Sequence, residues 1–334
     1  MLGLSRRHHQ QAIDRGEAGR GRNADRPGEI PKAGWRDILL RVKNEQSKDN
    51  LSMIAAGVAY YALLAVFPAL AAMVSVYGLA FDPRDVEAQI ASVGAVLPAE
   101  ATTLLNDQLK SLTSQPREGL GIGAAIGIIV ALWSASQGVK ALMTSLNIVY
   151  DEEETRGFIR FNAMALLLTF AAVLFLLVTL GTIAGIPAVI AYIGLTGPLE
   201  WVVRLLRWPL LAVMVMAGLA VLYRYAPDRR TPRWRWTSWG AVLATALWLL
   251  GSIAFSVYVS NFGSYDETYG SVGAVVILLL WLNLTAYVIL LGGELNAEME
   301  HQTARDTTSR DGNRTGRPLG ARDAYVADTV GEKP

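Results

Sequence analysis

Four polar residues of the last long apolar stretch share one face of the helix that this stretch predicts. They are Asn283, Tyr287, Glu294 and Glu298. Their steps of 4, 7 and 4 residues place them in a single stripe. Polar groups that face lipid are costly, so we expect the stripe to point into a helix bundle or a wet cavity. It predicts either structural hydrogen bonds near the inner interface or part of a transport path.

Two other places combine polar groups with apolar surroundings. In the second apolar stretch, Gln137 shares the inner half of a helical face with a serine and a threonine. Before the last stretch, a short outer turn contains Asn261, Tyr265 and Tyr269. These aromatic rings could cap the mouth of a cavity, although turn chemistry alone would also explain Asn261 and the glycines beside it. With Asn283, Tyr287 and Glu294, these residues are the candidates for a substrate path.

Several kinds of chemistry are not indicated. The chain has no cysteine, and its three histidines lie near the ends of the sequence, so we expect no metal site and no thiol catalysis. No nucleophile elbow or phosphate-binding glycine loop occurs, which leaves no catalytic residues and no cofactor to expect. The net charge of +1 argues against nucleic acid as a partner. The acidic run 151–154 reads as a solvated turn, with a cation or headgroup role as the alternative.

The elements that would position these residues are membrane helices. Hydrophobic residues make up 52% of the chain and charged ones 18%, and the apolar residues concentrate in the middle of the sequence. A helix needs about 20 mostly apolar residues to cross a bilayer. The predicted fold class is therefore all-α, a polytopic membrane helix bundle of about six transmembrane helices. The spans are expected at about 51–81, 119–139, 161–185, 208–223, 237–260 and 271–293.

The third stretch decides the number of spans. It is long enough for one crossing plus an interfacial piece, with a natural break at Gly185–Pro187. A seventh span would place the arginine-rich segment 224–235 outside, against the positive-inside bias. Six spans instead put this segment and both termini in the cytoplasm. The Arg233–Trp236 repeat is typical of an anchor at the membrane interface.

Three further regions complete the domain organisation. Residues 1–34 and 301–334 lack apolar surface and predict disordered cytoplasmic tails around a membrane domain at 35–300. The outer loop 82–118 carries two short amphipathic patterns, typical of a packed cap, or of a gate or a docking site for a partner. Small residues recur every four positions along the second span, which predicts close helix packing. The packing candidates are Gly119, Gly123 and Gly127, with Pro68 interrupting the first span.

Specific motifs resemble the YihY/BrkB family of bacterial inner-membrane proteins over roughly residues 35–300. They are Ala59–Leu64 with Phe67-Pro68, Tyr225–Arg230 leading to Trp236 and Gly240, Tyr258–Phe262, Thr268–Ser271, and Leu291–Glu298. The resemblance implies a six-span inner-membrane protein. It brings no secure biochemical activity, because the old ribonuclease BN label of the family requires a metal site and a basic groove that these residues do not supply.

Two functions follow as hypotheses, neither of them enzymatic. The first is transport or translocation of a small or amphiphilic substrate, with lipid among the candidates, in the plasma (inner) membrane of a bacterium. The second is an envelope scaffold or assembly partner that docks through the outer loop. The expected partners are the lipid bilayer, the substrate, and an envelope protein or a second copy of the chain.

Overall fold

The protein is an all-α bundle, as the sequence predicts. The computed structural model describes residues 19–21, 23–80, 122–194, 197–229, 233–261 and 271–303, and no strand occurs among them. A short 3-10 helix, η2 (Pro27–Glu29), precedes seven α-helices. These are α2 (Lys32–Lys48), α3 (Leu51–Ala80), α6 (Ile122–Val149), α7 (Phe158–Ile193), α8 (Pro198–Tyr225), α9 (Trp234–Asn261) and α11 (Ser271–Gln302).

The six long helices, α3 to α11, fall on the six apolar stretches. Within the described residues, four helices are long and apolar enough to cross a membrane, or five if α2 and the start of α3 count as one bent span. In these four, no more than 22% of the most apolar window is buried inside the protein. Apolar surface left this exposed is stable in lipid and not in water. The helices therefore contact a lipid bilayer.

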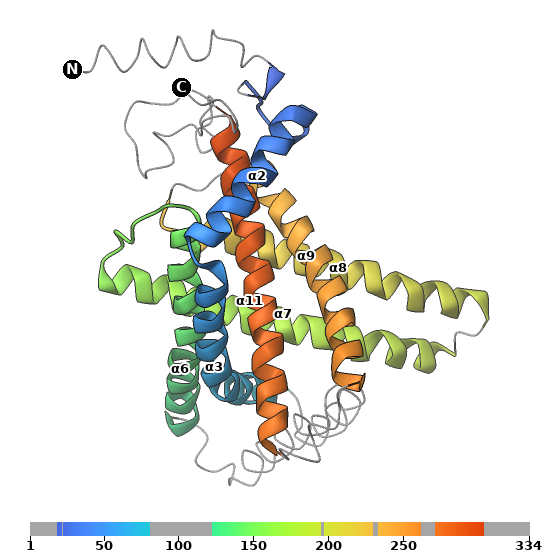
Figure 1. The fold of residues 1–334 in the computed structure, drawn as a ribbon. Coiled ribbons are helices and arrows are strands. Elements are labelled where there is room, and N and C mark those ends of the chain that lie inside the picture. Colours follow the sequence, from blue (N-terminus) through green and yellow to red (C-terminus); the bar gives the residue numbers. More distant parts are fainter. Residues whose placement is uncertain are drawn as a thin grey trace.

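Helix α11 lies at the centre of the bundle, where it packs against α2, α3, α6 and α9 (Figure 1). Helices α3, α6, α9 and α11 run lengthwise beside one another. Helices α7 and α8 form a hairpin that crosses behind them and extends beyond α9 (Figure 1). This hairpin joins the bundle through contacts of α7 with α6 and of α8 with α9.

Small residues bring the helices close together. A Cβ on Gly240 of α9 would lie 2.1 Å from the carbonyl oxygen of Gly292 on α11. A Cβ on Gly138 of α6 would lie 3.3 Å from the Cβ of Ala65 on α3. Such close approach of two backbones is the usual role of small residues between membrane helices.

Four helices differ from their predicted bounds. Helix α6 continues to Val149 rather than ending at 139. Helix α7 runs without a break through Gly185–Pro187 as far as Ile193. Helix α8 begins at Pro198 rather than at 208, and it contains Arg207, whose guanidinium donates to the carbonyl oxygen of Ile183 on α7 (3.2 Å). Helix α11 continues to Gln302 rather than ending at 293. In α8 and α11, the polar side chains near which the sequence predicts the helix to begin or end form hydrogen bonds with neighbouring elements, so the helix continues past them.

The inner parts of both predicted tails also fold. Ala24 and Ile30 are buried in a cluster with Trp236, although they fall within the predicted tail 1–34. His301 and Thr303 are buried too, although they fall within 301–334. The side chain of Thr303 donates to the carbonyl oxygen of Ala24 (2.8 Å). The two tails thus pack on each other where they leave the bundle, a contact that neither segment reveals by itself.

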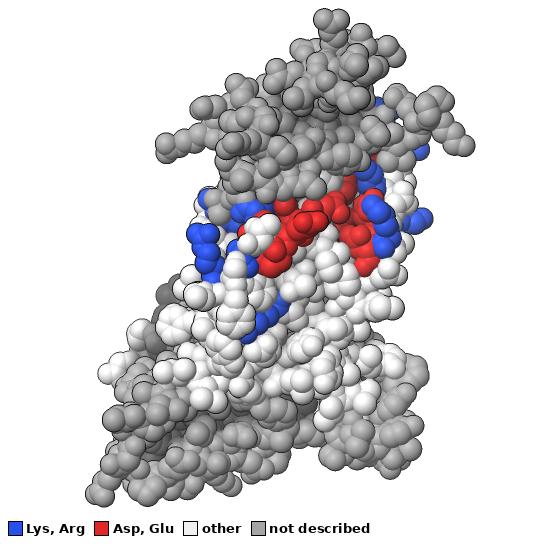
Figure 2. All heavy atoms as spheres, turned by 90° about the vertical axis from the view of Figure 1, so that its left-hand side faces the viewer, with Lys and Arg blue, Asp and Glu red and all other residues white. Residues whose placement is uncertain are grey.

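Charged residues gather at one end of the molecule. Figure 2 shows Lys, Arg, Asp and Glu in a band across this end, above a nearly uncharged surface. We call it the charged end; it comprises α2, the segments 150–157 and 226–229, the start of α9 and the last turns of α11. Several of the largest fully buried side chains, Trp236, Tyr150 and Met299 among them, also lie here. The charged end is therefore well packed.

Candidate functional site

The last turns of α11 carry a buried set of polar side chains. These are Glu294, Asn296, Glu298, Glu300, His301, Gln302 and Thr303. Buried polar groups need partners, because each loses its hydrogen bonds to water. The partners come from α2, α9 and the two connecting segments, so α11 is the element on which the charged end is assembled.

Helix α2 supplies Arg41, which is buried against α11. Its Nε donates to the carboxylate of Glu298, and one terminal nitrogen donates to Gln302 Oε1 (2.7 Å). On its other side, the Glu298 carboxylate lies 3.2 Å from His301 Nδ1. His301 therefore belongs to the folded core, and this corrects its placement in a tail. Histidine and arginine here hold one carboxylate, an arrangement that joins α2 to α11.

Arg229, from the segment between α8 and α9, forms the second buried ion pair. Its terminal nitrogens donate to both carboxylate oxygens of Glu300 (2.8 and 3.0 Å), and its guanidinium lies 4.1 Å from the centroid of the Tyr150 ring. Burial opposes the charged form of Arg229, but the Glu300 carboxylate outweighs it and raises the pKa of Arg229 above its ordinary value. The pair therefore stays ionised and fixes the segment to α11.

Asn147, at the end of α6, joins the two connecting segments. Its Oδ1 accepts the backbone N–H of Asp228 (2.8 Å), and its Nδ2 donates to Glu154 (2.9 Å). Asp228 in turn accepts the backbone N–H and the hydroxyl of Thr155, both at 2.6 Å. Glu154 also pairs with Arg156 (2.7 Å). The acidic run is thus partly engaged in this local network rather than wholly solvated.

Replacing Asn147 by alanine should destabilise the protein moderately. The change removes the acceptor of the part-buried Asp228 N–H, and an unsatisfied buried group costs about 1–3 kcal/mol. It also removes a donor to Glu154, but that residue is exposed and still pairs with Arg156. Thermal unfolding in detergent would measure the loss. The matched control is Asn44→Ala on the exposed face of α2, which should unfold as the wild type does. Equal unfolding temperatures for both variants would contradict the role of Asn147.

The predicted stripe of α11 is half-buried or buried in the bundle. Asn283 and Tyr287 are half-buried, and Glu294 is buried at the charged end. The hydroxyl of Tyr287 donates to Gln46 Oε1 on α2 (2.8 Å). The stripe therefore points inward, as the cost of facing lipid requires.

The other candidates are less fully described. Tyr265, Tyr269 and Gly119 lie outside the described residues. Asn261 closes α9, and Gly123 and Gly127 lie in the first turns of α6, but nothing is described of their surroundings. Pro68 lies inside α3 and is half-buried.

Gln137 differs from the α11 residues because it lies on the outer surface of α6. Trp133, Gln137 and Thr144 are exposed, and Lys140 between them is half-buried. Their spacing of 4, 3 and 4 residues puts the four on one helical face. We call these four residues the α6 stripe. A polar stripe on the outside of an apolar helix is costly in lipid, so it indicates a function or a covering partner.

Lys140 is a residue that the sequence pattern did not single out. Its Nζ lies 4.4 Å from the centroid of the Trp133 ring. Trp133 lies seven residues earlier, which is about 10 Å along the helix axis toward its N-terminal end. The ammonium group thus lies near the middle of α6 (Ile122–Val149) and points away from the charged end. The predicted span stopped at 139 and left this lysine at an interface, although it is the one charged residue in the sequence of the whole helix.

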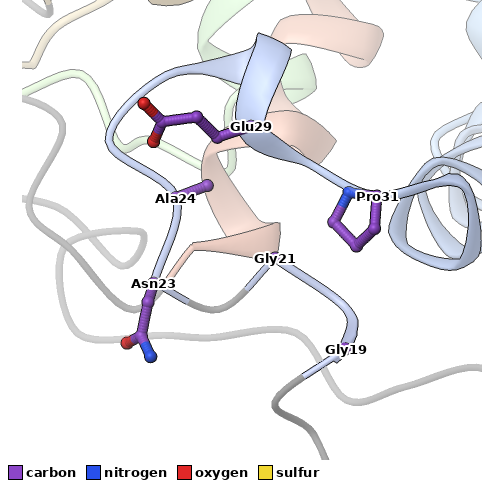
Figure 3. A pocket seen from close by; sticks show the side chains of 6 residues that line it. All are labelled: Gly19, Gly21, Asn23, Ala24, Glu29 and Pro31. Carbon is purple, nitrogen blue, oxygen red and sulfur yellow. The ribbon is translucent and has the colours of Figure 1, made fainter.

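Among the described residues, no group of three or more His, Cys, Asp or Glu is placed to hold a metal ion. Two hollows on the described surface lie beside Gly19–Pro31 (about 340 Å³, Figure 3) and along α2 (about 470 Å³), and neither of these two includes a residue of the α6 stripe. The charged end is a paired network that stabilises; the α6 stripe is a surface that a ligand can reach.

Comparison with known proteins agrees with this picture of a membrane helix bundle. The family model described as virulence factor BrkB matches residues 42–316. A Bacillus subtilis protein named as ribonuclease-like, YfkH, is 35% identical over 73% of this chain and 88% of its own length. Membrane proteins named UPF0761 from Pseudoalteromonas translucida and Photobacterium profundum are 24% and 26% identical, over 82% and 83% of this chain and 88% and 83% of theirs. No solved structure matches the chain.

Proposed function

The chain belongs to the virulence factor BrkB family of membrane proteins, and we propose that it moves an amphiphile with an anionic headgroup, such as a phospholipid, across the bilayer along the α6 stripe. The headgroup travels beside the polar side chains while the acyl chains stay in the membrane. The observation that carries the proposal is the ammonium group of Lys140, which lies near the middle of an apolar helix and on its accessible face.

The position of Lys140 argues against simple anchoring. A lysine that only avoids lipid extends its stem toward the nearest interface. Lys140 instead extends toward the middle of α6 and rests on Trp133. An ionisable group held at this depth is expensive, and such groups commonly mark substrate pathways. Gln137 and Thr144, on either side of the lysine, offer hydrogen bonds to a phosphate that leaves water.

The other candidate residues have supporting roles in this proposal. Tyr287 holds α11 to α2 through its hydrogen bond to Gln46, and Glu294 is buried on the same helix. Asn283 shares their face. Asn261, Tyr265 and Tyr269 would form the outer entrance, a role that rests on their sequence alone.

The orientation is part of the proposal. We place the charged end and both termini in the cytoplasm of a bacterium and the bundle in its plasma membrane, because the arginines of 224–235 then follow the positive-inside bias. The proposal includes no nuclease step. The word ribonuclease belongs to the name of YfkH, and the described residues offer no metal-binding cluster for such a reaction.

Lipid movement in vesicles tests the proposal. The full chain is reconstituted into liposomes that contain phosphatidylglycerol with a fluorescent headgroup label, and a membrane-impermeant reductant reports how fast inner-leaflet label reaches the outer leaflet. The wild type should move label faster than protein-free vesicles. Lys140→Met should slow the movement about tenfold or more, since charge-assisted hydrogen bonds contribute about 1.5–3 kcal/mol.

Two control variants separate the path from general damage. Lys140→Arg keeps the cation and should keep most of the activity. Thr182→Val changes a hydroxyl on α7 that donates to the carbonyl oxygen of Val178, and it should leave the rate unchanged. If Lys140→Met moves lipid as fast as the wild type, or if the wild type does not exceed empty vesicles, the proposed path is wrong.

A further inference from the structure

We infer that the outward face of α2 binds an anionic phospholipid of the leaflet next to the charged end. The face combines two basic residues, exposed leucines and Trp35, whose ring lies against Trp239 of α9. Its residues are distinct from the α6 stripe, so the inference holds or fails separately from the proposed function.

The direction of α2 brings it along the membrane surface. Helices α2 and α3 meet at an angle of 64°. Asn50 lies in the break with φ at 54°, a left-handed conformation that asparagine tolerates better than most residues. If α3 crosses the bilayer close to the membrane normal, α2 therefore lies closer to the membrane plane than to that normal. Helices in this position present one face to headgroups and acyl chains.

The two faces of α2 have different roles. The inner face is buried in the charged end through Asp37, Ile38, Arg41 and Val42. On the outer face, Leu39 and Leu40 are 57% and 36% exposed, although they are fully apolar. In water, exposed leucine side chains contribute nothing to stability. Beside a bilayer their apolar surface is buried in lipid, which is favourable. This pattern is typical of a helix whose outer face lies in the interface between membrane and water.

Two basic residues lie beside the leucines on α2. Lys32 and Arg36 lie one helical turn apart on α2, and with Trp35, Leu39 and Leu40 they line a shallow groove of about 470 Å³. Neither basic side chain has an ion pair with another residue in the described part of the chain. Unpaired cations beside apolar side chains match a phosphate headgroup and the start of its acyl chains.

Two tryptophans indicate the level of the membrane at which the groove lies. The rings of Trp35 on α2 and Trp239 on α9 lie 5.5 Å apart, and Trp239 is 46% exposed. Indole rings prefer the headgroup level of a membrane. Since Trp35 lines the groove and its ring contacts that of Trp239 on the membrane helix α9, the groove should open at the level where phosphates lie.

Charge argues for lipid rather than for a tail of this chain as the occupant. Residues 1–18 hold three arginines and two acidic residues, and residues 304–334 hold six basic and five acidic residues. Neither tail is an acidic segment that would complement Lys32 and Arg36. An anionic phospholipid supplies both the negative charge and the apolar chains. The hollow beside Gly19–Pro31 (Figure 3) lacks this combination, because its Glu29 already accepts from Asp25 and Arg26.

Lipid titration of the full chain in detergent tests the site. Phosphatidylglycerol should raise the unfolding temperature at lower concentration than phosphatidylcholine. The double variant Lys32→Gln/Arg36→Gln should raise the half-maximal phosphatidylglycerol concentration about tenfold or more, since each basic residue contributes to anionic lipid binding. The matched control Arg26→Gln/Lys48→Gln removes the same charge from two exposed residues of the same end and should behave as the wild type.

A second measurement identifies the occupant directly. A photo-crosslinking residue in place of Leu40, in vesicles of phosphatidylglycerol and phosphatidylcholine, should react mainly with phosphatidylglycerol. The crosslink from position 40 should be lost in the Lys32→Gln/Arg36→Gln variant, which assigns it to this site rather than to the lipid path along the α6 stripe. Equal titrations for the two double variants, or crosslinks to a tail or to a second copy of the chain, would overturn the inference.

Discussion

Replacing Gly240 by alanine is expected to destabilise the bundle severely. The added Cβ would lie 2.1 Å from the carbonyl oxygen of Gly292 and 2.5 Å from Nδ2 of Asn296, so the backbones of α9 and α11 must separate. The separation also strains the hydrogen bond in which the Gly240 N–H donates to Asn296 (2.8 Å). Overpacking of a core costs about 1–3 kcal/mol, and a clash with rigid backbone belongs at or above the upper end. Thermal unfolding in detergent measures it.

Gly181→Ala on α7 is the matched control for this prediction. It is also a glycine inside a long apolar helix, but a Cβ at this position would have no atom within 4 Å of it. Alanine favours helix over glycine, so this variant should be neutral or slightly stabilising. Similar unfolding temperatures for Gly240→Ala and Gly181→Ala would show that α9 and α11 are not in tight contact.

The second large effect is expected for Arg229→Met. This change leaves the carboxylate of Glu300, which is 2% exposed, without its bidentate partner. Breaking a buried ion pair from one side costs about 3–5 kcal/mol, because an uncompensated charge stays buried. The Tyr150 ring also loses the guanidinium stacked on it. We expect a large fall in unfolding temperature and in the yield of folded protein.

The double variant Arg229→Met/Glu300→Met distinguishes charge burial from packing. Removing both charges relieves the penalty, so the double variant should be more stable than Arg229→Met alone. Arg26→Met, which breaks a pair at the exposed Arg26, should have no measurable effect. A double variant no more stable than the single one would mean that Arg229 acts through its packing on Tyr150 instead.

The class of the fold follows from the sequence because long uncharged stretches have few stable alternatives. All six stretches became helices, since only internal hydrogen bonds satisfy a backbone in an apolar setting. The positions at which the helices begin and end do not follow from the sequence in the same way. Arg207 marked the start of a span, yet the helix continues through it because Ile183, on another helix, accepts its hydrogen bond. Such a partner is visible only in three dimensions.

The candidate site was predicted in part. Gln137 and the α11 stripe stand out in the sequence because polar residues are rare in apolar runs. Lys140 was missed because a charge at the edge of a stretch reads as its end, and the direction of its side chain is not encoded in spacing. The pairs of the charged end were also beyond prediction, since Arg41 and Glu298 lie 257 residues apart in the chain.

Two asparagines give the charged end a mechanical consequence. Asn147 on α6 and Asn296 on α11 each accept a backbone N–H from the chain that runs from the end of α8 into α9, at Asp228 and at Gly240. This stretch is therefore hydrogen-bonded to both helices at once. If the α3–α6 pair moves away from the α9–α11 pair, the charged end acts as the hinge, and the largest displacement occurs at the opposite ends of the helices.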